Sequence, residues 1–245
     1  MYFQDRATAG KLLAERLTMY VDQNAVVIAL SESSAVVAAQ VALKIHASMA
    51  LYMIKNINLP NEVEAAAALS SMGIFQFNSL FSAGQIEEMA SEYRTYFDEQ
   101  RIQKNHEMNL LLGDRGSIKK ELLRHHVVIV VADGLASGFT LSMVGAFLRT
   151  VAIKRFVIAT PVASVEAIDR MHLVADEMHC LSVPDNFMGV DHYYDVNGTT
   201  TIEDALKIFR NISLTWDLRR TDINEKDEKG NDKKSVQHKK HRFLQ

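Results

Sequence analysis

The stretch that decides the fold is VVIVVADGLASGFT, which runs from Val127 to Thr140. Its first six residues, Val127 to Ala132, are apolar and predict a strand that is buried on both faces. A loop from Asp133 to Thr140 follows, and the helical spacing of apolar residues returns from Leu141 to Arg149. A buried strand, a short loop and a helix in this order are typical of one repeat of a parallel α/β sheet.

The loop after this strand has the residue types of an anion site. Backbone N–H groups at a helix N-terminus attract a phosphate, and the helix dipole adds to the attraction. Ser137 and Thr140 contribute hydroxyl donors, and Gly138 permits close approach of the backbone. Asp133 suits a sugar diol, because a carboxylate accepts two hydroxyl hydrogen bonds. The loop therefore indicates a phosphorylated sugar, and the alternative is an ordinary turn between a strand and a helix.

Strand and helix patterns alternate along the rest of the chain. The predicted strands cover residues 25–30, 50–57, 73–77, 156–160 and 177–181, and the predicted helices cover residues 7–20, 35–46, 82–106 and 165–174. Residues 60–72 are rich in alanine and fit neither pattern clearly. Such alternation implies right-handed crossovers and a mostly parallel sheet flanked by helices. Loops after the strands then meet at one edge, which brings together residues 30–31, 133–134 and 160–161.

Composition excludes several classes of protein. The chain has 245 residues, 48% of them hydrophobic and 23% charged, which suits one large α/β domain or two small ones. A net charge of −3 creates no field that favours nucleic acid or a membrane as partner. The single cysteine, Cys180, excludes an internal disulfide and fits a reducing compartment. With neither a leader pattern nor a spanning apolar run, we expect a cytoplasmic protein.

The Asp133 loop resembles the ribose-5-phosphate loop of type I phosphoribosyltransferases. In that family, two adjacent acids hold the ribose hydroxyls, and a cradle of small residues holds the 5′-phosphate. Asp133 fills the second acid position, whereas Ala132 stands at the first. The resemblance assigns phosphoribose binding to Asp133, Gly134, Ala136, Ser137, Gly138 and Thr140. It implies no metal site made of protein ligands, and it implies that Asp133 would contribute to Mg²⁺ binding by way of the ribose.

The resemblance extends over most of the chain. The opening Phe3-Gln4-Asp5-Arg6 and the segment from Ala175 to Asp195 are similar to a bacterial phosphoribosyltransferase-like subfamily. It implies one type I phosphoribosyltransferase-like domain over residues 1–221, with a small hood subdomain built from parts of 58–115 and 183–200. Phe187 and Tyr193 become candidates for contact with a base, and plain packing is the equal alternative.

The loop after the first predicted strand departs from the family. Relatives in the subfamily have Pro-Arg-Gly-Gly there, and its backbone amides cradle the pyrophosphate together with Mg²⁺. This chain has Ser31-Glu32-Ser33-Ser34, which puts a negative charge where a positive one is expected. One pair of unit charges about 4 Å apart interacts with roughly 4 kcal/mol at an effective dielectric near 20, so the acid at this position is expected to weaken pyrophosphate binding and transfer strongly. Lys55 stands where relatives have a basic residue near the pyrophosphate, so it is expected to retain some anion affinity or to be exposed.

Three functions follow from these features. The first is a phosphoribosyltransferase-fold protein that binds a nucleotide or phosphoribosyl pyrophosphate, with impaired transfer activity. The second is an active glycosyltransferase that joins phosphoribosyl pyrophosphate to a nucleobase-like acceptor with Mg²⁺. The third is a structural homo-oligomer that binds no ligand. We expect a homo-oligomer in any case, and we assign no catalytic residue.

Other residues that could suggest a site are interpreted as structural. His172, Asp176, His179 and Cys180 have the chemistry of metal ligands, but their spacing matches no zinc site. Ser82 is expected to cap a helix. The strongly charged segment 222–245 is expected to remain solvated, and nucleic-acid contact through its basic residues is the less favoured alternative.

Overall fold

A five-stranded parallel sheet forms the centre of the computed structural model, which describes residues 1–62, 64–112, 118–198, 200–201 and 203–212. Its strand order is β2-β1-β6-β7-β8, and every neighbouring pair is parallel. The strands are β1 (Ala25–Ala29), β2 (Ser48–Leu51), β6 (Val127–Val131), β7 (Arg155–Val162) and β8 (Glu177–Ser182). The expected fold class, an α/β protein with a mostly parallel sheet, is confirmed.

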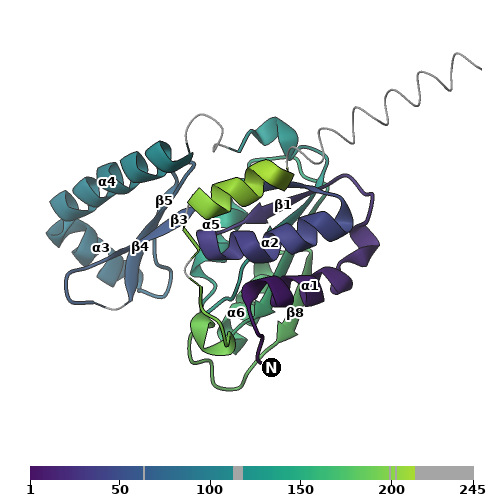
Figure 1. Cartoon of the computed structure of the whole chain (residues 1–245). Helices are drawn as coiled ribbons and strands as arrows, with labels where there is room; N and C mark the ends of the chain where they lie inside the picture. Colours follow the sequence, from purple (N-terminus) through teal and green to yellow (C-terminus); the bar gives the residue numbers. More distant parts are fainter. Residues whose placement is uncertain (63, 113–117, 199, 202, 213–245) are drawn as a thin grey trace, which may run out of the picture.

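Helices cover both faces of this sheet (Figure 1). On one face lie α1 (Arg6–Arg16), α2 (Glu32–Ile45) and the helical residues 203–212. On the other face lie α5 (Phe139–Leu148) and α6 (Val165–Val174), the latter with the bounds predicted from the sequence. Every residue of β1 and β6 is buried, because each strand sends alternate side chains into two hydrophobic layers. None of the described helices is long and apolar enough to cross a membrane.

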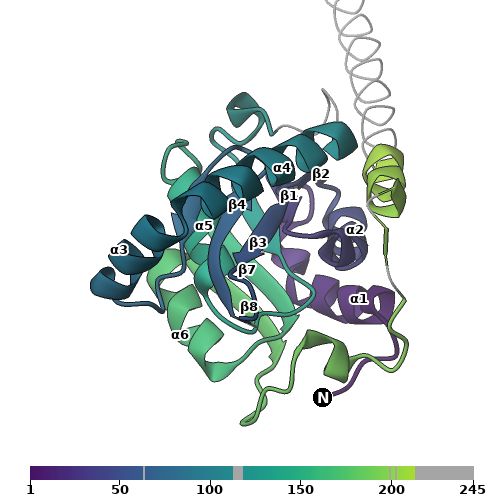
Figure 2. The ribbon, with the colours of Figure 1, turned by 90° about the vertical axis from the view of Figure 1, so that its left-hand side faces the viewer.

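A second, three-stranded antiparallel sheet extends from the first and carries two helices on its outer side (Figure 2). It consists of β3 (Ile54–Asn58), β4 (Ala65–Ser70) and β5 (Phe75–Phe77), followed by α3 (Ala83–Glu92) and α4 (Arg94–Leu112). The alanines of β4 are small enough for α5 to approach, so Phe139 and Met143 pack against Ala68. This sheet lies mostly within the stretch expected to supply the hood, whose role in binding stays a prediction.

Two predicted elements each form two elements in the structure, and one stretch without a clear pattern contains a strand. Residues 50–57 form the end of β2 and most of β3, in separate sheets, because the chain turns at the fully buried Tyr52 and Met53 without a glycine or proline. The predicted helix 82–106 is two helices, α3 and α4, that meet at Tyr93, although Ser82 caps the first of them as expected. Alanine-rich residues 60–72 contain β4. The charged segment 222–245 lies outside the described residues.

Close packing of α1 on α2 gives a test of the fold. A Cβ atom added to Gly10 would lie 2.9 Å from the carbonyl oxygen of Val37 and 3.0 Å from the Cβ of Gln40. We expect Gly10→Ala to lower the free energy of unfolding by about 1–3 kcal/mol, since the crowding outweighs the better helix propensity of alanine. Urea denaturation measures the change.

Gly84→Ala in α3 is the matched control, because a Cβ atom there meets nothing within 4 Å. Its free energy of unfolding should stay the same or rise by less than about 1 kcal/mol. If Gly10→Ala behaves like this control, α1 and α2 do not pack as closely as the structure shows.

Candidate functional site

The loops after β1 and β6 begin side by side at the carboxyl edge of the parallel sheet. Ala29 pairs with Val131 in the register of the two strands, and the N–H of Leu30 donates to the Val131 carbonyl at 3.3 Å. The expected third loop, at residues 160–161, is corrected by the structure, because β7 continues to Val162. The N–H of Leu135 donates to the Val162 carbonyl at 3.0 Å, which extends the pairing beyond the end of β6.

The loop after β6 is held from one side by the start of α6. The N–H of Ser164 donates to the Leu135 carbonyl at 2.9 Å, and its hydroxyl donates to the Ala136 carbonyl at 2.7 Å. Both contacts use carbonyl groups of the loop. Within the described part of the chain, no hydrogen bond is donated by the N–H groups of Ala136, Ser137 and Gly138. The amide side of the loop is therefore left for another acceptor.

Helix α5 begins two residues earlier than predicted, at Phe139 instead of Leu141, with Gly138 as its N-cap. Glycine has no side chain to cap the first turn, so the N-terminal N–H groups receive no side-chain acceptor. Ser137 and Thr140 are partly exposed residues, and neither hydroxyl makes a hydrogen bond to any described residue. The structure thus brings amide donors and two hydroxyls together at a helix N-terminus, which is the geometry of an anion site.

Asp133 is not free, because Arg6 from the start of α1 binds it. The Nε of Arg6 lies 2.8 Å from an Asp133 carboxylate oxygen, and the two side chains are only 8% and 13% exposed. Burial raises the pKa of the Asp133 carboxyl, although the Arg6 guanidinium beside it favours the charged form. Burial also disfavours the charged guanidinium, but its hydrogen bonds to Asp133 and Asp191 raise the pKa of Arg6 overall. One oxygen of the predicted ribose-binding carboxylate is therefore already engaged.

The same arginine ties the beginning of the chain to residues near the end of the described part. Its Nη2 lies 2.5 Å from the carboxylate of Asp191 in η4 (Val190–Tyr193), and its guanidinium lies 4.6 Å from the ring centroid of Tyr194. The Tyr194 hydroxyl donates to the carbonyl of Asp133. Backbone bonds between Phe3 and residues 193–195 close the arrangement.

The binding role of Arg6 was missed by the sequence interpretation, although a signal was present. Arg6 lies on the buried stripe of α1, together with Ala9, Gly10 and Leu13. A charged residue at a position with apolar spacing needs a buried partner of opposite charge. That requirement pointed to a carboxylate in the core of the site, but the spacing alone could not say which one.

The segment expected to be the pyrophosphate loop is the beginning of a helix. Helix α2 starts at Glu32, three residues before the predicted start at Ala35, because Ser31 is its N-cap. The Ser31 hydroxyl accepts from the N–H of Ser34 at 3.1 Å, and the Ser34 hydroxyl accepts from the N–H of Ser31 at 2.6 Å. Ser33 lies in the same first turn. The orphan N–H groups of this helix are thus partly satisfied by its own serines, a capping box.

Glu32 forms an ion pair with Lys55 of β3. The Lys55 ammonium lies 2.6 Å from a Glu32 carboxylate oxygen, and the side chains are 31% and 19% exposed respectively. Lys55, the basic residue expected near a pyrophosphate, therefore pairs with the acid at the position where the resemblance predicted an arginine. The pair adds no net charge to this side of the crevice.

The two candidates for base contact pack against each other. The ring centroids of Phe187 and Tyr193 are 5.4 Å apart, and Tyr193 is only 3% exposed. The Tyr193 hydroxyl accepts from the N–H of Met188 at 3.3 Å and donates to the carbonyl of Asn186 at 3.1 Å. Contact with a base stays a prediction for both residues, and for Tyr193 it requires exposure of a buried ring.

The described residues contain no group of three or more His, Cys, Asp or Glu side chains that could hold a metal ion. His179 faces Glu177 at 2.7 Å instead of joining a metal site with Cys180. At the carboxyl edge, Asp133 is bound by Arg6 and Glu32 by Lys55. The donor set therefore does not fit a resident Mg²⁺ ion.

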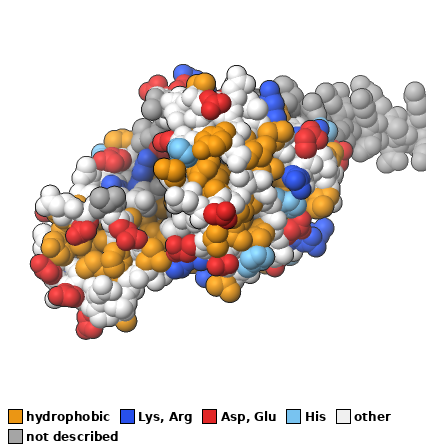
Figure 3. All heavy atoms as spheres, turned by 90° about the horizontal axis from the view of Figure 1, so that it is seen from below, with side chains coloured by type: hydrophobic (Ala, Val, Ile, Leu, Met, Phe, Trp, Pro, Cys, Tyr) orange, Lys and Arg blue, Asp and Glu red, His pale blue; other side chains and the backbone are white. Residues whose placement is uncertain are grey.

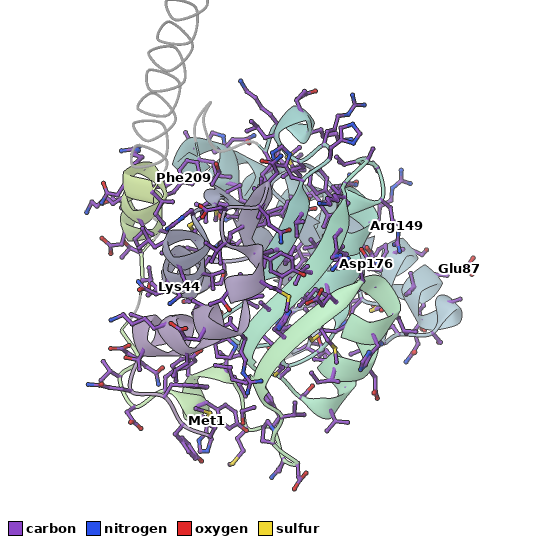
Figure 4. All side chains as sticks on the ribbon, turned by 90° about the vertical axis from the view of Figure 1, so that its right-hand side faces the viewer. Met1, Lys44, Glu87, Arg149, Asp176 and Phe209 are labelled. Atoms are coloured by element: carbon purple, nitrogen blue, oxygen red, sulfur yellow. The ribbon has the colours of Figure 1, made fainter. Side chains whose placement is uncertain are left out.

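The opposite edge of the sheet holds a separate cavity of about 200 Å³. Its lining residues come from the chain before β1 and from the starts of β6 and β7: Met19, Tyr20, Gln23, Val127, Lys154 and Arg155. Figure 4 marks this end of the sheet by Arg149 and Asp176, while Met1 lies at the other end. The cavity thus has no contact with the loop at Asp133.

Positive and negative side chains are mixed on the face of the molecule that lies at the bottom of Figure 1. Figure 3 shows acidic, basic and hydrophobic side chains intermingled on this face, without one large basic patch.

Comparisons with known proteins agree with this geometry. No protein-family profile matches the chain. The chain is 26% identical over 208 residues to proteins named "Putative phosphoribosyl transferase" in two strains of Mycobacterium tuberculosis, which covers 84% of this chain and 46% of theirs. The chain thus spans about half the length of these curated relatives.

A solved structure shares the fold over most of the chain. The crystal structure of TT1426 from Thermus thermophilus superposes with a TM-score of 0.65 and 26% identity, over 85% of this chain and 98% of that one. The chain is thus similar in sequence to proteins named putative phosphoribosyl transferases, and it shares the fold of TT1426.

Proposed function

We propose that this protein binds a 5′-phosphorylated ribose, such as a nucleoside monophosphate, at the loop Asp133–Thr140, and that its capacity to transfer phosphoribosyl groups is impaired. The observation that carries the proposal is a contrast between two helix N-termini at one sheet edge. The N-terminus of α5 has a glycine cap and amide groups that no described residue accepts from. The N-terminus of α2 is capped by its own serines.

The phosphate of the ligand would occupy the start of α5. Charge-assisted hydrogen bonds from backbone amides contribute about 1.5–3 kcal/mol each, and the helix dipole favours a negative group at this end. The hydroxyls of Ser137 and Thr140 lie at the same place and supply two further donors. Together these groups can donate hydrogen bonds to the three terminal oxygens of a phosphomonoester.

Asp133 would accept hydrogen bonds from the ribose hydroxyls. Arg6 holds one of its oxygens at 2.8 Å, which fixes the orientation of the carboxylate and favours its charged form beside the loop. With Ala132 at the first acid position, a single carboxylate serves the ribose. This arrangement supports binding, with one anchor fewer than the family pattern has.

Impaired transfer is proposed because Lys55, the basic residue expected near the leaving group, is paired with Glu32 in the described part of the chain. Breaking the anomeric bond of phosphoribosyl pyrophosphate transfers negative charge to the pyrophosphate, so that catalysis depends on electrostatic stabilisation there. The carboxylate of Glu32 and the ammonium of Lys55 cancel each other at 2.6 Å. A diphosphate in this position would meet a carboxylate in the first turn of α2.

Calorimetric titration tests the proposal directly. We expect a nucleoside monophosphate to bind without Mg²⁺, and phosphoribosyl pyrophosphate to bind no more tightly when Mg²⁺ is added. Mg²⁺-dependent preference for the pyrophosphate compound, with turnover in the presence of nucleobases, would instead identify an active transferase. Absence of heat with either compound would favour a structural homo-oligomer.

A charge placed in the cradle tests the location of the phosphate. We expect Ser137→Glu to lower the affinity for a nucleoside monophosphate by at least about tenfold, because a carboxylate beside a phosphate repels it. Thr150→Glu, at the opposite end of the α5 region, introduces the same charge away from the loop and should leave the affinity unchanged. Equal affinities of both variants would place the ligand elsewhere.

Removal of the Glu32 charge tests the account of the closed pyrophosphate site. Glu32→Gln releases Lys55, so we expect the affinity for phosphoribosyl pyrophosphate to rise by about tenfold, or about 1.4 kcal/mol. Glu15→Gln is the matched control, since Glu15 forms a similar 2.6 Å pair with Lys44 on the outside of α1 and α2. The account is wrong if Glu32→Gln weakens binding of the pyrophosphate compound.

A further inference from the structure

Arg170 of α6 lies directly against the proposed phosphate site. A Cβ atom added to Gly138, the N-cap of α5, would be 2.0 Å from the Cδ of Arg170 and 2.6 Å from its Cγ. A glycine leaves room here for the Arg170 side chain. The reason is this close contact and not the backbone conformation, because φ of Gly138 is −85° and any residue can adopt that value. Gly138 is therefore required for contact with Arg170 and α6, in addition to any approach of a ligand.

Most N–H donors of the Arg170 guanidinium make no hydrogen bond to a described residue. Its Nη1 donates to the Ser79 hydroxyl at 2.9 Å, and its Nε lies 3.7 Å from a Glu166 carboxylate oxygen, which is too far for a hydrogen bond. A guanidinium has five N–H donors, so one hydrogen bond to a neutral hydroxyl leaves most of them unused. The side chain is 28% exposed, which leaves the group accessible to a ligand.

Arg170 differs in this respect from the other basic side chains described above at the same edge. Arg6 forms hydrogen-bonded ion pairs with Asp133 and Asp191, and Lys55 forms one with Glu32. Their charges are compensated within the protein at distances of 2.5–2.8 Å. Arg170 also has a carboxylate nearby, that of Glu166 at 3.7 Å, but this ion pair contains no hydrogen bond, so the N–H donors of Arg170 stay available next to the start of α5.

We propose that Arg170 is the cationic ligand-binding residue of this site, and that its guanidinium binds the phosphomonoester seated on the loop from Ala136 to Thr140. This inference rests on the proposed function and extends it by a residue from a different helix. Two bonds separate the Cδ that covers Gly138 from the guanidinium carbon, so the charge lies close to the amide donors of the cradle. A guanidinium binds two phosphate oxygens at once, which suits a terminal phosphate better than a bridging phosphodiester.

The choice of variant follows from the packing. Arg170→Gln keeps the Cβ, Cγ and Cδ atoms that cover Gly138 and removes the guanidinium alone. Arg149→Gln makes the same change at the C-cap of α5, at the far end of the sheet (Figure 4). Thermal denaturation of both variants verifies that the fold is intact, and Arg170→Lys restores a positive charge without the two-pronged geometry.

Calorimetry with a nucleoside monophosphate, repeated at several salt concentrations, gives the decisive measurement. We expect Arg170→Gln to lower the affinity by about tenfold or more and to flatten its salt dependence, because one charge contact is lost. Arg170→Lys should recover part of the affinity, and Arg149→Gln should match the wild-type protein.

The outcomes separate this inference from the function on which it rests. If the wild-type protein binds the monophosphate and Arg170→Gln binds it equally well, the role of Arg170 is wrong and the proposed function stands. If the wild-type protein binds no monophosphate, the proposed function fails first, and the role of Arg170 fails with it.

Discussion

The ion pair between Arg6 and Asp133 joins three distant parts of the chain at the carboxyl edge of the sheet. Asp133 follows the central strand soon after its last residue, Arg6 begins α1, and Asp191 in η4 binds the same guanidinium. Loss of one partner of a buried pair leaves an uncompensated charge, which costs about 3–5 kcal/mol. The position of α1 and of the segment around Tyr194 therefore depends on this contact, and so does the orientation of the carboxylate beside the candidate phosphate site.

Much of the main sheet could be predicted from periodicity, because its strands are apolar on both faces. Val127–Val131 and Val165–Val174 appear where the pattern predicted a strand and a helix. The prediction of one strand over residues 50–57 was wrong, because the chain leaves one sheet and enters another there, and the residues belong to two strands. Tyr52 and Met53 are apolar and buried like the strand residues around them, so no local signal marks the turn. Only tertiary packing distinguishes the two strands.

The candidate site shows the same division between local and distant information. Ser137, Gly138 and Thr140 are close in sequence, so their meeting at one helix start followed from the chain order. Arg6 and Arg170 arrive from other helices, and no spacing relates them to the loop. The pairing of Glu32 with Lys55 depended on the register of β3, which the sequence interpretation had placed in the wrong sheet.

The two strand-to-helix junctions at this edge satisfy the same physical demand in opposite ways. Each helix presents unpaired N–H groups and a positive dipole end, and each gains stability from a negative group there. After β1, the chain supplies its own acceptors through Ser31 and Ser34, and Glu32 places a carboxylate in the first turn of α2. These groups meet part of the demand that a bound anion would meet at this helix start. After β6, Gly138 supplies no side-chain acceptor, and no described residue accepts from the loop amides before α5, which is why we propose binding at this junction.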